Sequence, residues 1–240
     1  MKGVVLAGGL GTRLMPLTKV LNKHILPVGK KPMIFHPIER MVEAGITDIM
    51  IVSSPSGMGS IFNLLGSGSD LGCSLTYRVQ DKPDGIGGAL LLCKDFVGKD
   101  SCLVVLGDNI FTANISDHVS NYIQNIKEGS VFFLREVSDP HRYGVATLDK
   151  DNCLVRITEK PVEPDTNLCI TGVYIYDSDV FDIIQEIKPS KRGELEITDI
   201  NNEYIRRKKT SYFLLEGMWT DAGTWDSYMY ANQEIHRART

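Results

Sequence analysis

The chain has 240 residues, of which 42% are hydrophobic and 23% are charged. This composition is typical of a globular protein and excludes a largely disordered one. The 26 basic residues are outnumbered by 30 acidic residues, and the formal net charge of −4 argues against a protein that coats nucleic acid. A small, local phosphate site is still compatible with this charge.

Apolar runs and cysteines indicate the compartment. The longest apolar runs, such as 103–106, are far shorter than the ~20 residues of a membrane-spanning helix. Only one short apolar run follows the first two residues, so we expect no secretory signal. The five cysteines are widely spaced and form no C-x-x-C pair, which argues against a zinc site and a disulfide framework. We therefore expect a cytoplasmic protein with free thiols and with neither a membrane nor a nucleic acid as partner.

The first half of the chain alternates short apolar runs with helical patterns. Near-continuous apolarity predicts buried strands at Lys2–Ala7, Asp48–Ser53, Ser74–Val79, Cys102–Leu106 and Ser130–Glu136. Apolar residues at helical spacing predict one helix over 34–42, closed by Gly45, and another over 115–126, closed by Gly129. Repeated β-α-β units predict a doubly wound α/β fold, with a mostly parallel, mixed sheet and helices on both faces.

The second half adds a mixed edge to this sheet. Its predicted strands lie at Val145–Leu148, Leu154–Thr158, Ile170–Tyr176 and Tyr212–Leu215, and its predicted helices at Ser178–Ile187, Glu196–Arg207 and from about Thr224. The polar residues 149–152 predict a hairpin turn between the first two of these strands. No linker separates domains, so we expect a single domain over 1–240, with a nucleotide-binding core at about 1–135 and a substrate lobe at about 136–240.

A glycine-rich turn follows the first strand directly. Gly8, Gly9 and Gly11 remove Cβ atoms where backbone N–H groups could approach phosphates, at the strand end where such sheets bind ligands. Arg13 and Lys23 lie close by in sequence and favour an anionic ligand. The turn lacks the third glycine and the acidic ribose partner of a dinucleotide fingerprint, and the chain has no P-loop motif. Nicotinamide chemistry and P-loop ATPase activity are therefore disfavoured.

Two aspartates follow apolar, strand-like segments. Asp108 comes just after the predicted strand 102–106, so its carboxylate should emerge at the carboxyl edge of the sheet. Asp221 follows Trp219 in a second strand-to-helix turn. Mg²⁺ is usually held by one or two carboxylates together with substrate phosphates. Both aspartates are therefore candidate metal ligands, and helix capping is the alternative reading, above all for Asp221.

A series of motifs runs through nearly the whole chain. It comprises residues 3–18, 22–28, 31–33, 79–80 with 83–85, 106–111, 139–145, 159–161, 171–174, 192–201 and 219–224. In this order the motifs resemble the signature of the sugar-1-phosphate nucleotidylyltransferase family. The resemblance implies a Rossmann-like, GT-A-like nucleotidyltransferase fold in which the lobe at about 136–240 binds the sugar phosphate. It points to the short members that use dTTP and glucose 1-phosphate, without the C-terminal helical segment that longer members tie to an allosteric nucleotide site.

The resemblance also implies a reaction and its residues. A phosphate oxygen of α-D-glucose 1-phosphate would attack the α-phosphorus of dTTP, giving dTDP-glucose and pyrophosphate with Mg²⁺ as cofactor. The catalytic residues would be Arg13, Lys23, Asp108 and Asp221, and the metal ligands Asp108 and Asp221. The nucleotide-binding residues would be Leu6, Ala7, Gly8, Gly9, Gly11, Thr12, Arg13, Gln80, Pro83, Gly85 and Asp108. The sugar-phosphate-binding residues would be Asn109, Tyr143, Gly144, Glu159, Lys160, Val173 and Arg192. A homodimer or homotetramer that supplies nucleotide sugars for polysaccharide synthesis is implied as well.

Several alternatives stay open. His24 and Gly88 stand where many longer members have glutamine, so UTP or another hexose 1-phosphate could be the substrate. A non-catalytic sensor of nucleotide sugars would need no pair of metal carboxylates, and a hydride-transfer enzyme is a distant third. Solvated surface charge is the alternative reading of each cation. Asp177-Ser178-Asp179 imitates the D-x-D metal motif, but its place between a strand and a helix favours a capping role.

Overall fold

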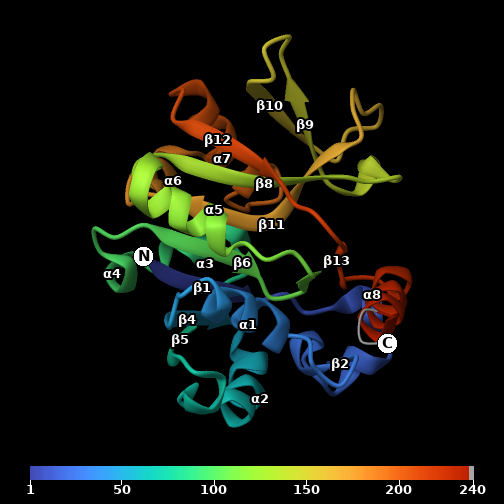
Figure 1. Cartoon of the computed structure of the whole chain (residues 1–240). Coiled ribbons are helices and arrows are strands. Elements are labelled where there is room, and N and C mark those ends of the chain that lie inside the picture. The colour runs from blue at the N-terminus through green and yellow to red at the C-terminus, as the bar shows by residue number, and fades with distance from the viewer. Residues whose placement is uncertain (238–240) are drawn as a thin grey trace. The chain divides into compact units, whose positions relative to one another are not determined.

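The structure, a computed structural model, describes residues 1–237 (Figure 1). The chain packs into two units that are each assembled from separate segments. The N-terminal unit comprises Lys2–Pro83, Val105–Asp117 and the chain from Glu216 onward, and the central unit comprises Asp84–Val104 and His118–Leu215 together with Met1. The expected division into a nucleotide-binding core and a sugar-phosphate lobe near residue 135 stays a prediction, since these units are defined by packing and not by what they bind.

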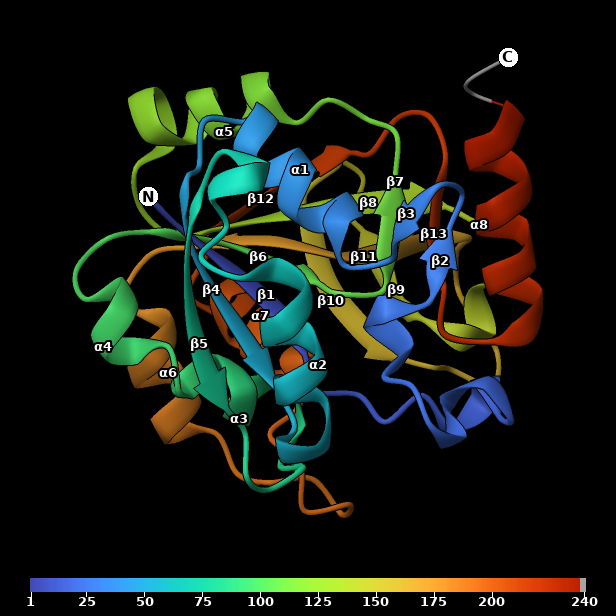
Figure 2. The ribbon, with the colours of Figure 1, turned by 90° about the horizontal axis from the view of Figure 1, so that it is seen from below.

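The N-terminal unit is built on parallel strands. Its strands are β1 (Lys2–Ala7), β2 (Pro27–Val28), β3 (Lys31–Pro32), β4 (Asp48–Ser53), β5 (Ser74–Val79), β7 (Asn109–Phe111) and β13 (Trp219–Asp221). Its helices are α1 (Phe35–Glu43), α2 (Pro55–Leu65) and α8 (Trp225–Arg237), with the 3₁₀ turns η1 (Thr12–Leu14), η2 (Leu17–Lys19), η3 (Lys23–Ile25) and η4 (Ser69–Leu71). Strands β1, β4 and β5 pair in parallel and in this order, as Figure 2 shows from below. Their carboxyl ends therefore meet at one edge.

One group of buried side chains in this unit packs against the short segments that follow β1. Its members are Leu14, Leu26, Val28, Met33, Ile110, Ala222, Tyr228, Ala231 and Ile235. They come from η1, the β2–β3 hairpin, β7, the end of β13 and α8, which are distant from one another in sequence. Burial of these side chains provides the hydrophobic free energy that holds these short elements together.

The central unit has a mixed sheet. Its strands are β8 (Ser130–Glu136), β9 (Gly144–Leu148), β10 (Leu154–Glu159), β11 (Leu168–Tyr176) and β12 (Thr210–Leu214). Its helices are α3 (Gly85–Leu91), α4 (Lys94–Val97), α6 (Val180–Glu186) and α7 (Ile197–Arg206), with the π-helical turn η5 (Tyr122–Ile126) and the 3₁₀ turn η6 (Pro140–Arg142). The strand order is β10-β9-β11-β8-β12, in which only β8 and β12 are parallel. Strand β6 (Cys102–Leu106) and helix α5 (Ser116–Asn121) each run from one unit into the other.

The elements predicted from periodicity agree closely with the structure. The five strands predicted in the first half coincide with β1, β4, β5, β6 and β8, and the α/β class with a mixed sheet is confirmed. Helix α1 ends as predicted, because Gly45 adopts a φ of +79° and donates its N–H to Val42 O at 2.9 Å. The predicted helix over 115–126 is wrong in its second half, where α5 passes into the π-helical turn η5. This turn changes the phase of the helix, so Tyr122 is buried while Ile123 is exposed.

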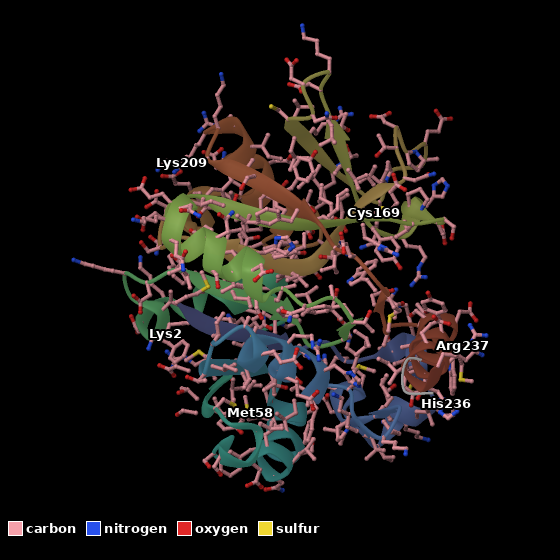
Figure 3. All side chains as sticks on the ribbon, viewed as in Figure 1. Lys2, Met58, Cys169, Lys209, His236 and Arg237 are labelled. Carbon is pink, nitrogen blue, oxygen red and sulfur yellow. The ribbon has the colours of Figure 1, made fainter. Side chains whose placement is uncertain are left out.

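The first aspartate of the D-x-D segment has a structural role. Asp177 accepts the Tyr204 hydroxyl at 2.6 Å and the backbone N–H groups of Asp179 and Gly129 at 3.2 and 2.5 Å, so its carboxylate stabilises the start of the next helix and a neighbouring turn. All five cysteines are free thiols, and Cys169 is buried in β11 (Figure 3). Lys209, on the surface in Figure 3, pairs with Asp179 at 3.1 Å, in agreement with a solvated charge. Among the described residues, the structure has no helix with the length and apolarity needed to span a bilayer.

The bond between Tyr204 and Asp177 leads to a stability prediction. Tyr204→Phe removes a buried hydroxyl that donates to a carboxylate, and we expect the free energy of unfolding to fall by about 2 kcal/mol in urea titrations. Tyr212→Phe is the matched control, because the Tyr212 hydroxyl donates to Asn152 O at 3.1 Å on the exposed surface, where the loss should stay below about 0.5 kcal/mol. Equal losses in the two variants would contradict a structural role for Asp177.

Candidate active site

The glycine turn wraps around the Lys23 side chain. A Cβ atom built on Gly9 would lie 3.2 Å from Lys23 Nζ, and one built on Gly11 would lie 2.9 Å from Lys23 Cβ. Gly11 also has a φ of +67°, a left-handed conformation that favours glycine. A Cβ atom on Gly8 would lie 2.8 Å from Gln80 Oε1. The absence of side chains therefore allows two predicted site residues to approach the turn's backbone.

Lys23 and Asp108 form a largely buried ion pair, whose side chains are 10% and 15% exposed. Lys23 is only 8% exposed and its ammonium contacts Asp108 Oδ2. Burial alone would raise the pKa of Asp108, but the charge of Lys23 and hydrogen bonds from Lys23 and Asn109 outweigh it and hold this pKa well below its ordinary value. Burial, together with the charge of Lys23, lowers the pKa of His24 to about 3. The neutral His24 ring donates from Nδ1 to Asn22 Oδ1 at 2.9 Å, so His24 adds no charge to the site.

The two predicted metal ligands converge. A Cβ atom built on Gly223 would lie 3.5 Å from Asp108 Oδ2 and 3.5 Å from Asp221 Oδ2. The same point lies 3.2 Å from Nη2 of Arg13, which forms no ion pair within the described part of the chain. Two carboxylates and an available guanidinium thus surround a space that Gly223 leaves open.

This space fits a small divalent cation bound to phosphates. Oxygen donors are the ligands that Mg²⁺ prefers, and it commonly takes only one or two of them from protein carboxylates. Asp108 and Asp221 supply that number, and no cluster of three or more metal-ligating side chains occurs among residues 1–237. The site therefore has the donor set of a metal that is shared with a substrate and not that of a metal held by protein alone.

Backbone pairing explains why these aspartates meet. Strands β7 and β13 are antiparallel with Asn109 opposite Asp221, and the Ala222 N–H donates to Asp108 O at 2.8 Å. Ile110 and Ala222, one or two positions from the aspartates, point into the buried group beneath. The Trp219 indole donates to Asn109 Oδ1 at 2.8 Å across the same two strands. The sequence predicted a strand-to-helix turn at Asp221, in agreement with β13, but it missed β7, because a three-residue strand carries no usable periodicity.

Other predicted nucleotide-binding residues of this unit lie around the turn. Leu6 and Ala7 are buried at the end of β1, where their carbonyls accept Gly107 N–H at 2.9 Å and Ser53 Oγ–H at 3.0 Å. Their side chains are therefore not available to a ligand. Thr12 is exposed next to Gly11 at the start of η1, and Pro83 is exposed near the end of β5.

The central unit contains a polar cavity of about 820 Å³. Glu159, Lys160 and Arg192, all predicted sugar-phosphate residues, line it. Glu159 pairs with Lys160 Nζ at 2.8 Å and accepts the Thr198 hydroxyl at 2.7 Å. Arg192 makes two bonds of 2.9 and 3.0 Å to Glu196, which also lines the cavity. Thr198 and Glu196, which also line the cavity, were not predicted individually, although both lie inside the motif 192–201.

Three further predicted residues shape this unit without lining the cavity. Gly144 faces Glu159 across the β9–β10 pairing, where a Cβ atom would lie 3.5 Å from Glu159 Oε2. The Tyr143 carbonyl accepts the Lys160 N–H at 2.9 Å, which holds the loop after β10. Val173 is fully buried in β11, so its side chain is inaccessible to a ligand.

Gly85 and Asn109 are not among the residues that line this cavity. Gly85 has a φ of +93° and packs on the backbone of Leu195, where a Cβ atom would come within 2.7 Å of the carbonyl oxygen. Packing against Leu195 thus requires a glycine at position 85, independently of any contact with a nucleotide. Asn109 belongs to the N-terminal unit and lies beside Asp108.

Comparison with known proteins decides the family. Residues 2–238 match the family model described as nucleotidyl transferase. The chain belongs to the nucleotidyl transferase family. The glycine turn, the Lys23–Asp108 pair and the convergent aspartates are therefore features of a nucleotidyl transferase.

Individual relatives show which nucleotidyl transferases this chain is similar to. A glucose-1-phosphate thymidylyltransferase of Neisseria meningitidis is 40% identical over 95% of this nucleotidyl transferase and 80% of the relative. A Bacillus anthracis protein, described as a candidate glucose-1-phosphate thymidylyltransferase in complex with sucrose, is 52% identical with a TM-score of 0.93, covering 97% of this chain and 94% of the other. A UDP-glucose pyrophosphorylase complexed with UDP-glucose is 27% identical with a TM-score of 0.87, covering 99% of this chain and 98% of the other.

The buried ion pair can be tested in this nucleotidyl transferase. Lys23→Met leaves the Asp108 carboxylate buried without its cation, and we expect the free energy of unfolding to fall by about 3 kcal/mol in denaturant titrations. Lys31→Met is the control, since the Lys31–Glu39 pair is more exposed and its loss should cost less than about 1 kcal/mol. An unchanged free energy in Lys23→Met would show that the pair is not structurally important.

Proposed function

We propose that the chain transfers a thymidylyl group from dTTP to α-D-glucose 1-phosphate, forming dTDP-glucose and releasing pyrophosphate, with Mg²⁺ as cofactor. The observation that carries the proposal is the convergence of Asp108 and Asp221 beside Arg13 and the glycine turn. The name of the Neisseria meningitidis relative, at 40% identity, supports the choice of dTTP and glucose 1-phosphate.

The chemistry asks the protein mainly for positioning and charge neutralisation. A phosphate oxygen of the sugar phosphate forms a bond to the α-phosphorus of dTTP, while the bond from that phosphorus to the leaving pyrophosphate breaks. No protein nucleophile is needed. Arg13, which has no ion-pair partner in the described chain, is proposed to offset phosphate charge as the two anionic reactants approach.

Asp108 and Asp221 are the proposed ligands of Mg²⁺, which, when bound, would neutralise phosphate charge and polarise a phosphoryl oxygen. Lys23 has a second proposed role. Its ammonium contacts the Asp108 oxygen that borders the space left by Gly223, so it compensates the carboxylate when no cation is bound. When a cation is bound, the ammonium is proposed to bind a substrate phosphate instead. Backbone N–H groups of the turn 8–11 are proposed to bind the triphosphate.

The cavity of the central unit is proposed to bind the hexose 1-phosphate. Lys160 and Arg192 supply positive charge for the phosphate, while Glu159 can accept hydrogen bonds from ring hydroxyls. The Thr198 hydroxyl holds one Glu159 oxygen, which orients the carboxylate. Gln80, whose amide lies over Gly8, is proposed to pair with the pyrimidine edge.

UTP in place of dTTP is the second candidate, favoured by the structural similarity to the UDP-glucose pyrophosphorylase at a TM-score of 0.87. Thymine and uracil present the same pairing edge, so the position of Gln80 supports either base.

A homodimer or homotetramer is proposed from the family resemblance, and the free thiols support a cytoplasmic location.

Pyrophosphate release tests the proposal. The wild-type chain should release it fastest with dTTP and glucose 1-phosphate when several nucleotides and sugar phosphates are compared. Asp108→Asn and Asp221→Asn should each lower turnover by at least ~10², because each removes a ligand whose charge matters in the transition state, while nucleotide binding largely survives. Asp70→Asn, on the exposed turn η4, is the control and should leave turnover unchanged. Full activity in both site variants would refute the assigned metal site, and activity with UTP alone would replace the substrate.

The space beside Gly223 offers a steric test. Gly223→Ala places a methyl group 3.5 Å from both carboxylate oxygens, where the cation should lie, and we expect turnover to fall by about 10²-fold. The change should leave the melting temperature nearly unaffected, because the nearest atom, 3.2 Å away, is the mobile end of Arg13. Gly59→Ala is the matched control, since a Cβ atom there meets nothing within 4 Å. Normal turnover of Gly223→Ala would mean that this space holds no reacting group or cation.

A further inference from the structure

The Asp108 carboxylate is held at both oxygens. Oδ2 contacts the Lys23 ammonium, and Oδ1 accepts a hydrogen bond from Asn109 Nδ2 at 3.2 Å. Asn109 Oδ1 in turn accepts the Trp219 indole N–H at 2.8 Å. A chain of two hydrogen bonds therefore leads from the Trp219 indole through the Asn109 amide to a proposed metal ligand.

The donor and the acceptor of each of these two hydrogen bonds follow from the chemistry of the groups. An indole nitrogen can only donate, so the Asn109 atom that faces it must be the oxygen. The amide NH₂ is then directed to Asp108, which as a carboxylate can only accept. Each group has a partner of the opposite kind, and the orientation of the Asn109 amide is determined without ambiguity.

The two hydrogen bonds lie among groups that are shielded from water. Asn109 is 2% exposed and Trp219 is 7% exposed. Both belong to the β7–β13 pairing, in which Trp219 lies opposite Phe111 and Asp221 lies opposite Asn109. Hydrogen bonds between buried polar groups are strong in such surroundings, because no water competes for them.

We propose that Trp219 and Asn109 are positioning residues that hold the Asp108 carboxylate in the orientation that binds the metal. The inference rests on the proposed function and assigns Asn109 a task other than the sugar-phosphate contact expected from the sequence. Asp108 Oδ2 is the oxygen nearest the space beside Gly223, and Asn109 holds the other oxygen. Without that bond the carboxylate can rotate, and only Lys23, which competes with a cation for Oδ2, restrains it.

The test compares the two tryptophans of the chain. Trp219→Phe keeps an aromatic ring in place and removes the indole N–H. Because the proposed metal is shared with phosphates, Mn²⁺ is titrated into the protein in the presence of dTDP-glucose and followed by EPR. We expect Mn²⁺ to bind about tenfold more weakly, as for other groups that orient metal ligands. Trp225→Phe is the matched control, since its indole donates to Met15 O at 3.0 Å and reaches no carboxylate. Wild-type affinity in Trp219→Phe would overturn the inference.

A double-mutant cycle separates positioning from general loosening of β13. If Trp219 acts through Asn109, then Trp219→Phe should have no further effect on Mn²⁺ affinity in an Asn109→Ala background. Additive losses would overturn the inference, because they would show that Trp219 acts by another route. Asn109→Ser replaces Asn109→Ala if circular dichroism shows that the alanine variant is unfolded.

The metal titration also distinguishes this inference from the proposed function. Asp108→Asn should lose Mn²⁺ binding altogether. If Asp108→Asn loses binding and Trp219→Phe does not, the metal site stands and the positioning role fails. If the wild-type protein binds no Mn²⁺ and releases no pyrophosphate with any nucleotide, the proposed function fails, and the positioning role fails with it.

Discussion

The pairing of β7 with β13 is the constraint on which the metal site depends. It joins segments separated by 110 positions between Asn109 and Trp219, and its three residue pairs place Asp221 beside the segment that carries Asp108. Closing so long a loop has an entropic cost, although that cost grows only slowly with loop length. Three backbone pairs would not offset it in water, so the buried side chains beneath are essential. Ile110 and Ala222 belong to that buried group, and thus the same packing that stabilises the strands also aligns the aspartates.

Charge compensation is the second theme of the site. A buried carboxylate is costly unless a cation or hydrogen bonds accompany it, and Asp108 has both in Lys23 and Asn109. Lys23 is itself enclosed by the glycine turn, whose missing Cβ atoms leave room for its side chain. The turn therefore has two tasks. It exposes backbone N–H groups, and it accommodates the cation that keeps Asp108 ionised.

Much of the fold was predictable from periodicity, and the reason is visible in individual elements. Strands such as β1 and β4 are long enough to show continuous apolarity, and α1 combines a helical spacing with a glycine in the left-handed conformation after its end. Where a pattern is short or irregular, prediction failed. Helix α2 contains two glycines and a weak apolar stripe, and α3 contains three glycines, so neither was expected. The phase change at η5 was missed because a π-helical turn has no signature in apolar spacing.

The sequence by itself determined the chemical types at the site and their order along the chain. A glycine turn after a strand, with a lysine and an arginine nearby, favoured an anionic ligand, and two aspartates at strand ends were candidate metal ligands. The resemblance of the motifs to a known family implied the cation and the phosphate substrates. Only the tertiary structure decided that Asp108 and Asp221 border one space, that Lys23 rather than Arg13 pairs with Asp108, and that the Asn109 amide is oriented by Trp219. These facts depend on packing between segments 85 or more residues apart, and local sequence carries no information about which distant side chains will be neighbours.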